Sequence, residues 1–318
     1  MLTLLLACGP STIDVDDTGA DASVATDDTG SAAADDTGGA DDTGGGGGSD
    51  GPGVVDHSDD APLAELAELT NYDCPDFSKQ TSTFWSSDEM RDVTVLIPSS
   101  GAKGKSVTFV WHSIGTLPAD FISAFDLEQM AEEMDTVIVM PEQKPANYLA
   151  WDYYVAEGGD DLPLYDDLRT CLSQELEVDL TRFYSWGFSA GAVWTSFLSL
   201  NRGDTLAAVV AFSGGLVDIV FDWQEPGQKF PALLFHGGET DLWGISGVYE
   251  VEFMNTTIAL ADNLEKAGHE VALCDHGLGH YVPYEWETAI TQWLYRNVYG
   301  QQQMAAEALD GLPDCGWY

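Results

Sequence analysis

The sequence predicts an α/β fold with a mostly parallel central sheet and helices on both faces of that sheet. From residue 62 onward, short β-rich runs alternate with longer helix-like stretches. Several of the β-rich runs are apolar on both faces, as buried parallel strands are. A Gly-x-Ser-x-Gly motif also stands where one such run passes into a helix-like stretch. Together these observations indicate one domain over residues 62–318.

The elements follow from the periodicity of apolar residues along the chain. The expected strands are 91–97, 106–111, 136–140, 182–187, 206–212, 232–236 and 269–274. The expected helices are 119–134, 163–177, 190–202, 253–267 and 284–299. The first strands have no helix between them, so we expect them to form an antiparallel edge. The alternation that follows them implies parallel neighbours.

The first 61 residues differ from the rest of the chain in composition. They contain 14 aspartates and no lysine or arginine, and the tetrapeptide Asp-Asp-Thr-Gly occurs four times before a run of five glycines at 44–48. So few large apolar side chains cannot offset the entropy lost on ordering. We therefore expect residues 9–61 to be a disordered, flexible linker, with the aspartates acting as a spacer rather than as a calcium site.

The N-terminal sequence MLTLLLACGPST is typical of a bacterial lipoprotein signal. A short apolar run ends in Leu-Leu-Ala-Cys, which predicts a signal over residues 1–8 and lipidation of Cys8. The positively charged segment of such signals is missing, so a chance leucine-rich start is the alternative. The first interpretation predicts an extracytoplasmic protein, lipid-anchored or secreted, whose linker holds the domain away from a bacterial membrane.

Charge excludes one class of partner. The chain has 54 acidic and 11 basic side chains, and residues 62–318 alone carry a net charge of −29. Nucleic-acid binding needs clustered cations that neutralise phosphates. We therefore expect no nucleic acid partner, and a soluble monomer.

Two groups of residues outside the motif have structural interpretations. Cys74, Cys171, Cys274 and Cys315 form an even set that suggests two disulfides with three connectivities, or alternatively buried free thiols. No CxxC pair is present, so we expect no metal site. The cluster Asp160, Asp161, Asp166 and Asp167 is expected to be a solvated loop and helix start rather than a metal site.

The motif Gly187-Phe188-Ser189-Ala190-Gly191 is the strongest functional signal. A strand that reverses into a helix here brings two backbones close together, which requires small flanking residues. The central serine is held in a strained conformation, with its side chain above the sheet and beside the helix N-terminus. We therefore predict that Ser189 is a nucleophile, the alternative being a plain tight-turn residue.

A serine hydroxyl needs a base and an orienting acid, which in this arrangement follow it in the order acid, then histidine. The strand at 232–236 runs into a loop that carries Glu239 and Asp241, and we favour Asp241 as the acid. The last strand runs into a glycine-containing loop that carries His276 and His280, and we favour His280 as the base. Glu239 and His276 remain alternatives.

Acyl transfer also needs donors for the oxyanion of the tetrahedral intermediate. One is expected from the backbone N–H of Ala190, the residue after the nucleophile. The other should come from the loop after strand 106–111, with the amide of Ile114 first and Ser113 next. His112 in that loop is interpreted as a structural hydrogen-bonding residue rather than a second base.

Aromatic residues near the motif suggest how substrate binds. Trp243 and Trp151 lie in predicted loops and, with Phe188, are candidates to line a substrate pocket. Trp186 is expected to belong to the core. Only a short segment separates strand 206–212 from strand 232–236, which favours an open cleft over a tunnel beneath a lid.

GFSAG, the HGGETD loop and GHYVP together resemble the α/β-hydrolase superfamily, and within it the secreted polyhydroxybutyrate depolymerase and feruloyl esterase-like group. The resemblance covers roughly residues 80–300 and implies serine ester hydrolysis without a cofactor. It assigns Ser189 as nucleophile, His280 as general base and Asp241 as orienting acid. The sequence departs from the family where His112-Ser113 stands in place of His-Gly.

The leading interpretation is a serine carboxylic-ester hydrolase that acts outside the cytoplasm on polyester-like or plant-polymer-derived esters. Two other functions stay open. One is a serine peptidase of the same fold, and the other is a non-catalytic surface binding protein that retains it.

Overall fold

The structure is a computed structural model that describes residues 54–56, 62–144, 149–153, 159–245, 249–283, 287–303, 309–312 and 314–318. These belong to one compact unit, Ser49–Tyr318. Cys8 and nearly all of the expected linker lie outside the described residues. Within the linker, Val54–Asp56 forms strand β1, in which the two valines are β-branched. This strand pairs with β12 (Gln301–Gln303) in a separate antiparallel ribbon.

The core of the fold is a nine-stranded sheet with the order β13-β11-β8-β7-β6-β4-β5-β3-β2. Its strands are β2 (Thr81–Ser86), β3 (Glu89–Leu96), β4 (Ser106–Trp111), β5 (Thr136–Pro141), β6 (Phe183–Phe188), β7 (Ala208–Phe212), β8 (Ala232–His236), β11 (Val271–Asp275) and β13 (Cys315–Trp317). The neighbours from β5 to β11 run parallel, while β2, β3 and β13 pair antiparallel at the two edges. The expected antiparallel edge is therefore β2–β3, whereas β4 joins the parallel set.

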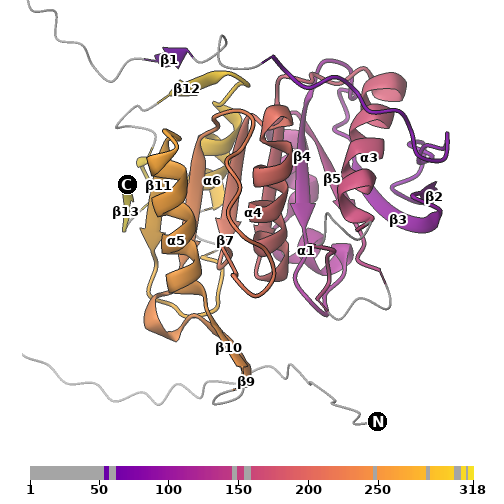
Figure 1. The fold of residues 1–318 in the computed structure, drawn as a ribbon. Helices are drawn as coiled ribbons and strands as arrows, with labels where there is room; N and C mark the ends of the chain where they lie inside the picture. Colours follow the sequence, from indigo (N-terminus) through magenta and orange to yellow (C-terminus); the bar gives the residue numbers. More distant parts are fainter. Residues whose placement is uncertain are drawn as a thin grey trace, which may run out of the picture. The chain divides into compact units, whose positions relative to one another are not determined.

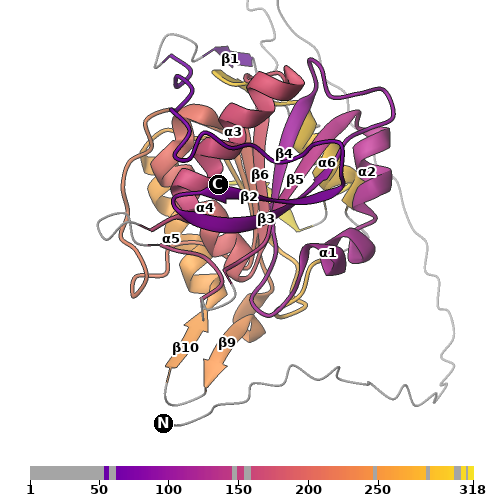
Figure 2. The ribbon, with the colours of Figure 1, turned by 90° about the vertical axis from the view of Figure 1, so that its right-hand side faces the viewer.

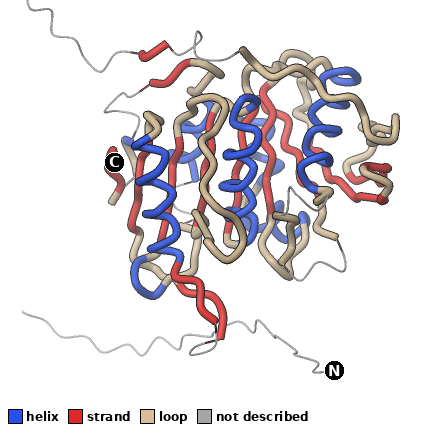
Figure 3. The backbone as a smooth tube through the Cα atoms, in the orientation of Figure 1, coloured by secondary structure: helices blue, strands red, loops and turns tan. Residues whose placement is uncertain are grey.

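Helices cover both faces of the sheet, as predicted (Figures 1 and 3). The helices are α1 (Pro118–Ala124), α2 (Leu127–Glu133), α3 (Asp161–Leu176), α4 (Ala190–Arg202), α5 (Phe253–Lys266) and α6 (Glu287–Tyr295). One hydrophobic cluster packs α3, α4 and α5 on the sheet, and a second packs α1, α2 and α6 on the other face. Alternate residues of each central strand contribute to the two clusters, which explains why these strands are apolar at nearly every position. None of the described helices has the length and apolarity needed to cross a bilayer.

The single helix expected over 119–134 is wrong. The structure divides it into α1 and α2, because Asp126 adopts a left-handed backbone conformation with φ 44°. A short polar side chain tolerates this conformation. The break turns Phe125 inward, where it packs on Trp186 with ring centroids 4.8 Å apart. Trp186 lies in the core, as expected.

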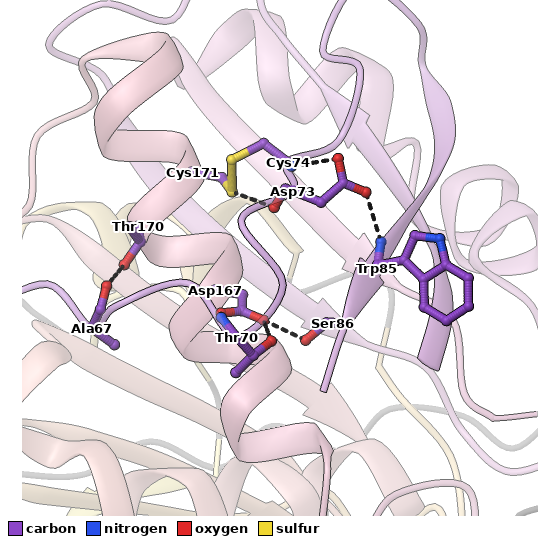
Figure 4. Close-up of a disulfide and its surroundings, with 9 residues drawn as sticks. All are labelled: Ala67, Thr70, Asp73, Cys74, Trp85, Ser86, Asp167, Thr170 and Cys171. Carbon is purple, nitrogen blue, oxygen red and sulfur yellow. Dashed lines mark hydrogen bonds between the residues drawn. A yellow bond between two sulfur atoms is a disulfide. The ribbon is translucent and has the colours of Figure 1, made fainter. Parts of the chain in front are cut away.

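Two disulfides secure the ends of the domain, and the connectivity left open by the sequence is Cys74–Cys171 and Cys274–Cys315. Figure 4 shows the first of them, where the segment before β2 lies along α3. Next to it, the Thr170 hydroxyl donates to the Ala67 carbonyl. The second disulfide joins β11 to the edge strand β13.

The four aspartates at the start of α3 are not a solvated cluster, which corrects the expectation. Asp161 is fully buried and pairs with Arg91 at 2.7 Å, and the Asp167 carboxylate accepts hydrogen bonds from Thr70 and Ser86. Asp160 and Asp166 pair with Lys144 and Arg202. The carboxylates bind separate basic or hydroxyl groups, so they fasten neighbouring segments to the helix.

Candidate active site

The turn from β6 into α4 has the strain that the motif predicts. β6 ends at Phe188 and α4 begins at Ala190, and Ser189 between them has φ 56° and ψ −121°. Such a conformation costs about 1–3 kcal/mol and persists only where the surroundings impose it. The Ser189 N–H donates to the Phe212 carbonyl at 2.9 Å, while the Ser189 carbonyl accepts the N–H groups of Ala192 and Val193 in α4.

Two glycines allow this turn to close. A Cβ atom on Gly187 would stand 2.2 Å from the Gly191 carbonyl oxygen. A Cβ atom on Gly191 would stand 1.9 Å from the carbonyl oxygen of Trp111, at the end of β4. Both distances exclude any larger residue, so the glycines of the motif are required for close backbone packing.

The structure brings Ser189, His280 and Asp241 into one hydrogen-bonded chain. His280 Nε2 lies 2.9 Å from Ser189 Oγ, and His280 Nδ1 lies 2.7 Å from Asp241 Oδ1. Asp241 follows the short 3₁₀ turn Gly238–Thr240 after β8, and His280 follows β11. Because β6, β8 and β11 are parallel, their carboxyl ends lie at the same end of the sheet.

The alternative acid and base lie elsewhere. Glu239 is exposed in the 3₁₀ turn. His276 is buried, its N–H donates to the His236 carbonyl, and its Nδ1 accepts the N–H of Leu278. His276 thus holds the loop that carries His280.

The other carboxylate oxygen of Asp241 has two donors of its own. Ser213 Oγ donates to Asp241 Oδ2 at 2.8 Å, and the Gly237 N–H donates to the same oxygen at 2.9 Å. Asp241 is fully buried, so these donors offset the cost of removing a charge from water. The sequence analysis missed Ser213. The sequence feature that could have identified it is the run Ser-Gly-Gly directly after a strand.

Two aromatic rings enclose the imidazole of His280. Phe253, at the start of α5, stacks on it with centroids 4.8 Å apart and an interplanar angle of 15°. Phe188 packs on His280 at 4.8 Å with a 31° angle. The structure therefore places Phe188, expected to line the substrate pocket, against the histidine instead, and it adds Phe253, which the sequence analysis did not identify.

An apolar cavity of about 50 Å³ opens beside Ser189. Ile114 and Ala190 line it, together with Leu149, Tyr153, Val217, Trp243 and Phe253. Trp243 thus lies where the sequence interpretation placed it. It belongs to β9 (Leu242–Ile245), which pairs antiparallel with β10 (Tyr249–Glu252) in a hairpin that the sequence analysis missed. Figure 2 shows this hairpin projecting beyond the end of the sheet.

Trp151 does not line the pocket, which corrects the expectation. Its side chain is 1% exposed and packs between Trp111 and Trp194. Its indole N–H donates to the His112 carbonyl at 3.1 Å, while the hydroxyl of nearby Tyr153 donates to the Ala190 carbonyl at 3.0 Å. Residues 149–153 therefore bind the loop after β4 and the nucleophile turn together.

The loop after β4 is held by His112. Its Nδ1–H donates to the Ser113 carbonyl at 3.0 Å, and its Nε2 accepts the N–H of Gln143 at 3.2 Å. Burial lowers the pKa of His112, and its hydrogen bond to Ser113 opposes that shift. The neutral ring thus spans two loops and fits the structural role expected of it. Ile114 lines the pocket, whereas Ser113 is buried outside it.

No group of three histidine, cysteine, aspartate or glutamate side chains in the described part of the chain is arranged to hold a metal ion.

Neither the protein-family models nor the curated proteins include a match to the sequence. Solved structures do match. The crystal structure of native sOPH is 15% identical, with a TM-score of 0.59 over 76% of this chain and 94% of that chain. Native pOPH is 13% identical, with a TM-score of 0.59 over 74% and 91%. A ferulic acid esterase is 16% identical, with a TM-score of 0.54 over 68% and 97%. The chain has the α/β-hydrolase fold.

Proposed function

We propose that the protein is a serine carboxylic-ester hydrolase. The observation that carries the proposal is the chain of hydrogen bonds from Ser189 Oγ through His280 to Asp241, with the serine on a strained strand-to-helix turn. These are the three roles that acyl transfer requires: nucleophile, general base and orienting acid. A structural neighbour named as a ferulic acid esterase supports this class of reaction.

The reaction proceeds through an acyl-enzyme. His280 Nε2 takes the proton of Ser189 Oγ as this oxygen attacks the ester carbonyl carbon. The backbone N–H groups of Ala190 and Ile114 stabilise the resulting oxyanion, and Ser113 is the alternative donor. When the intermediate collapses, His280 returns the proton to the leaving alcohol. A water then attacks the acyl-enzyme by the same route and releases the carboxylic acid.

The surroundings of His280 favour this proton transfer. Phe253 and Phe188 cover the imidazole, while Asp241 binds Nδ1 and so leaves Nε2 directed at the serine. The imidazolium formed in each step lies against a buried carboxylate, where charge–charge attraction is stronger than in water.

The pocket indicates a short acyl group. Its volume of about 50 Å³ is well below the ~150 Å³ cavity that accepts benzene. Its lining is apolar apart from the Ser189 and Tyr153 hydroxyl groups and the Trp243 indole N–H. We therefore favour short acyl or hydroxyacyl units, as in an aliphatic polyester, over bulky aromatic acids.

The rim of the site favours an apolar or polymeric substrate. Ten large apolar side chains are exposed in the described part of the chain. Six of them lie in segments that follow the carboxyl ends of the parallel strands, the end of the sheet that carries the triad: Leu117, Leu149, Ile219, Leu242, Leu278 and Tyr281. Exposed apolar groups that gather at one place mark binding surfaces.

We place this activity outside the cytoplasm. The two disulfides suit an oxidising compartment. The predicted lipidation of Cys8 and the Asp/Gly-rich linker would tether the domain to a bacterial membrane, with no nucleic acid partner. The enzyme acts as a monomer and needs no cofactor.

A serine peptidase is the second candidate, because a groove beside the pocket is lined by four carboxylates: Asp218, Asp222, Glu250 and Glu252. A substrate ammonium group would suit that charge. A comparison of p-nitrophenyl esters with aminoacyl p-nitroanilides as substrates decides between the two activities. We expect the full chain to hydrolyse p-nitrophenyl acetate and butyrate faster than longer esters, and aminoacyl p-nitroanilides hardly at all. Preferential anilide cleavage would favour the peptidase, and a well-folded protein that cleaves neither substrate would favour the binding protein.

A further inference from the structure

Ser213 occupies a strained position at the end of β7. It is fully buried, and its φ of 55° lies in the left-handed region that favours glycine. For a serine this conformation is unfavourable, and it persists only where the surroundings impose it. The Ser213 N–H extends the β7–β8 ladder by donating to the Phe235 carbonyl at 2.9 Å. The backbone strain therefore serves to direct the hydroxyl.

The two residues after Ser213 hold this turn in place. A Cβ atom on Gly214 would stand 2.8 Å from Ala192 in α4, and one on Gly215 would stand 2.1 Å from the Thr256 carbonyl oxygen in α5. The Gly214 carbonyl accepts the Thr256 hydroxyl at 2.6 Å, and the Gly215 N–H donates to Ser196 Oγ at 3.0 Å. The turn is thus fixed to both helices and cannot shift independently of them.

The hydroxyl of Ser213 donates to Asp241 Oδ2, which is not the oxygen that binds His280. Together with the Gly237 N–H, it holds the carboxylate plane from the side opposite the imidazole. A carboxylate bound at only one oxygen can rotate about its Cβ–Cγ bond, so the second pair of donors limits the orientations that Oδ1 can take.

We infer that Ser213 is a positioning residue for the reaction, which orients Asp241 so that Oδ1 stays aligned with His280. The consequence for catalysis rests on the proposed function, whereas the hydrogen bond from Ser213 to Asp241 does not depend on that function. Without this donor, the carboxylate would rotate more freely, and Oδ1 would be aligned with His280 Nδ1 for less of the time. The hydrogen bond that orients the imidazole would then be weaker.

The test compares Ser213→Ala and Ser213→Gly with wild type in the full chain. Both variants remove the hydroxyl, but glycine also relieves the backbone strain. We expect kcat for p-nitrophenyl butyrate to fall about 10- to 100-fold in both, with KM changed less than about 2-fold. Ser213→Thr, which keeps a hydroxyl, should recover part of the loss.

Ser199→Ala is the matched control, because it removes another buried hydroxyl that donates only to a backbone carbonyl of α4. It should leave kcat and KM unchanged. Wild-type kcat in Ser213→Ala would overturn the inference. So would recovery of the rate in Ser213→Gly, since the serine would then matter only through its backbone.

A second measurement separates this inference from the proposed function. The His280 Nδ1–H proton, bound to Asp241, gives a strongly downfield proton NMR signal, which can be identified by its loss in His280→Gln. We expect this signal to shift upfield and exchange faster with water in Ser213→Ala. An unchanged signal would contradict the inference even if the wild type hydrolyses no ester. Inactivity of the wild type with an altered signal would contradict only the proposed function.

Discussion

His280 Nε2 lies 2.9 Å from Ser189 Oγ, although 91 positions separate the two residues along the chain. The strands that precede them, β6 and β11, are parallel members of one sheet with β7 and β8 between them. β7 leads to Ser213 and β8 to Asp241, so the neighbouring strands β7, β8 and β11 supply Ser213, Asp241 and His280, each bonded to the next, while Ser189 follows β6. The topology of the sheet, rather than sequence proximity, assembles the site.

Asp241→Asn should lower kcat about 10³- to 10⁴-fold, because an amide can present its NH₂ group to His280 and favour the wrong tautomer. Glu239→Gln is the matched control, since Glu239 is an exposed acid in the same loop. It should keep wild-type activity. Steady-state kinetics with p-nitrophenyl butyrate checks both variants. The opposite ranking would transfer the acid role to Glu239.

Trp243→Ala should enlarge the pocket and change the preference for acyl length. Trp243 lines the cavity beside Ser189, so its removal makes room for longer chains. We expect the ratio of kcat/KM for the octanoate ester to that for the acetate ester to rise about 10-fold or more. Trp223→Ala, which alters the neighbouring groove instead, should leave this ratio unchanged. An unchanged ratio in Trp243→Ala would show that the acyl group binds elsewhere.

Glu270→Gln should stabilise the protein at neutral and alkaline pH. Burial raises the pKa of Glu270 from 4.5 to about 7. Between these values the unfolded chain releases a proton that the folded protein keeps, so the free energy of unfolding falls as pH rises through this window. The variant does not undergo this loss. Its free energy of unfolding should therefore exceed that of wild type by about 2–3 kcal/mol above pH 7 and differ little from it near pH 4.

Urea unfolding of the two proteins at pH 4, 6 and 8 measures this difference. Glu175→Gln, at an exposed position on α3, provides the control and should show no such trend with pH. A difference between Glu270→Gln and wild type that does not vary with pH would contradict the assignment.

Each disulfide should contribute several kcal/mol to stability. The bonds close loops of 97 and 41 residues, for which loop-closure entropy gives about 4.7 and about 4 kcal/mol. The double variant Cys74→Ser/Cys171→Ser should therefore lose somewhat more stability than Cys274→Ser/Cys315→Ser, as measured by urea unfolding. A free thiol at any of these four cysteines in the non-reduced wild type, located by alkylation and mass spectrometry, would contradict the pairing that contains it.

Periodicity predicted the sheet well because its central strands are buried on both faces, so their apolar runs are unambiguous. It failed at the edges. β2 and the β9–β10 hairpin mix exposed and buried positions, and β13 is only partly buried and pairs with β11, which is distant in sequence. The break between α1 and α2 escaped notice because it depends on one left-handed residue, Asp126.

The three catalytic residues could be predicted from the sequence, whereas most of the residues around them could not. The motif around Ser189 and the order of acid and histidine along the chain can be recognised in a single sequence. Ser213, Phe253 and Tyr153 lie near the triad only because the sheet and helices bring them there. Trp151 shows the reverse error, since a tryptophan in a predicted loop proved to be core packing.

The most direct test of the central claim is covalent labelling of the full chain with a fluorophosphonate probe, read by intact mass and peptide mapping. An activated serine becomes phosphonylated, whereas an ordinary buried serine does not. We predict one adduct per molecule, located on the peptide that contains Ser189 and absent from Ser189→Ala. The labelling rate should fall by several orders of magnitude in His280→Gln. Folded wild-type protein that takes up no probe at Ser189 would contradict the account.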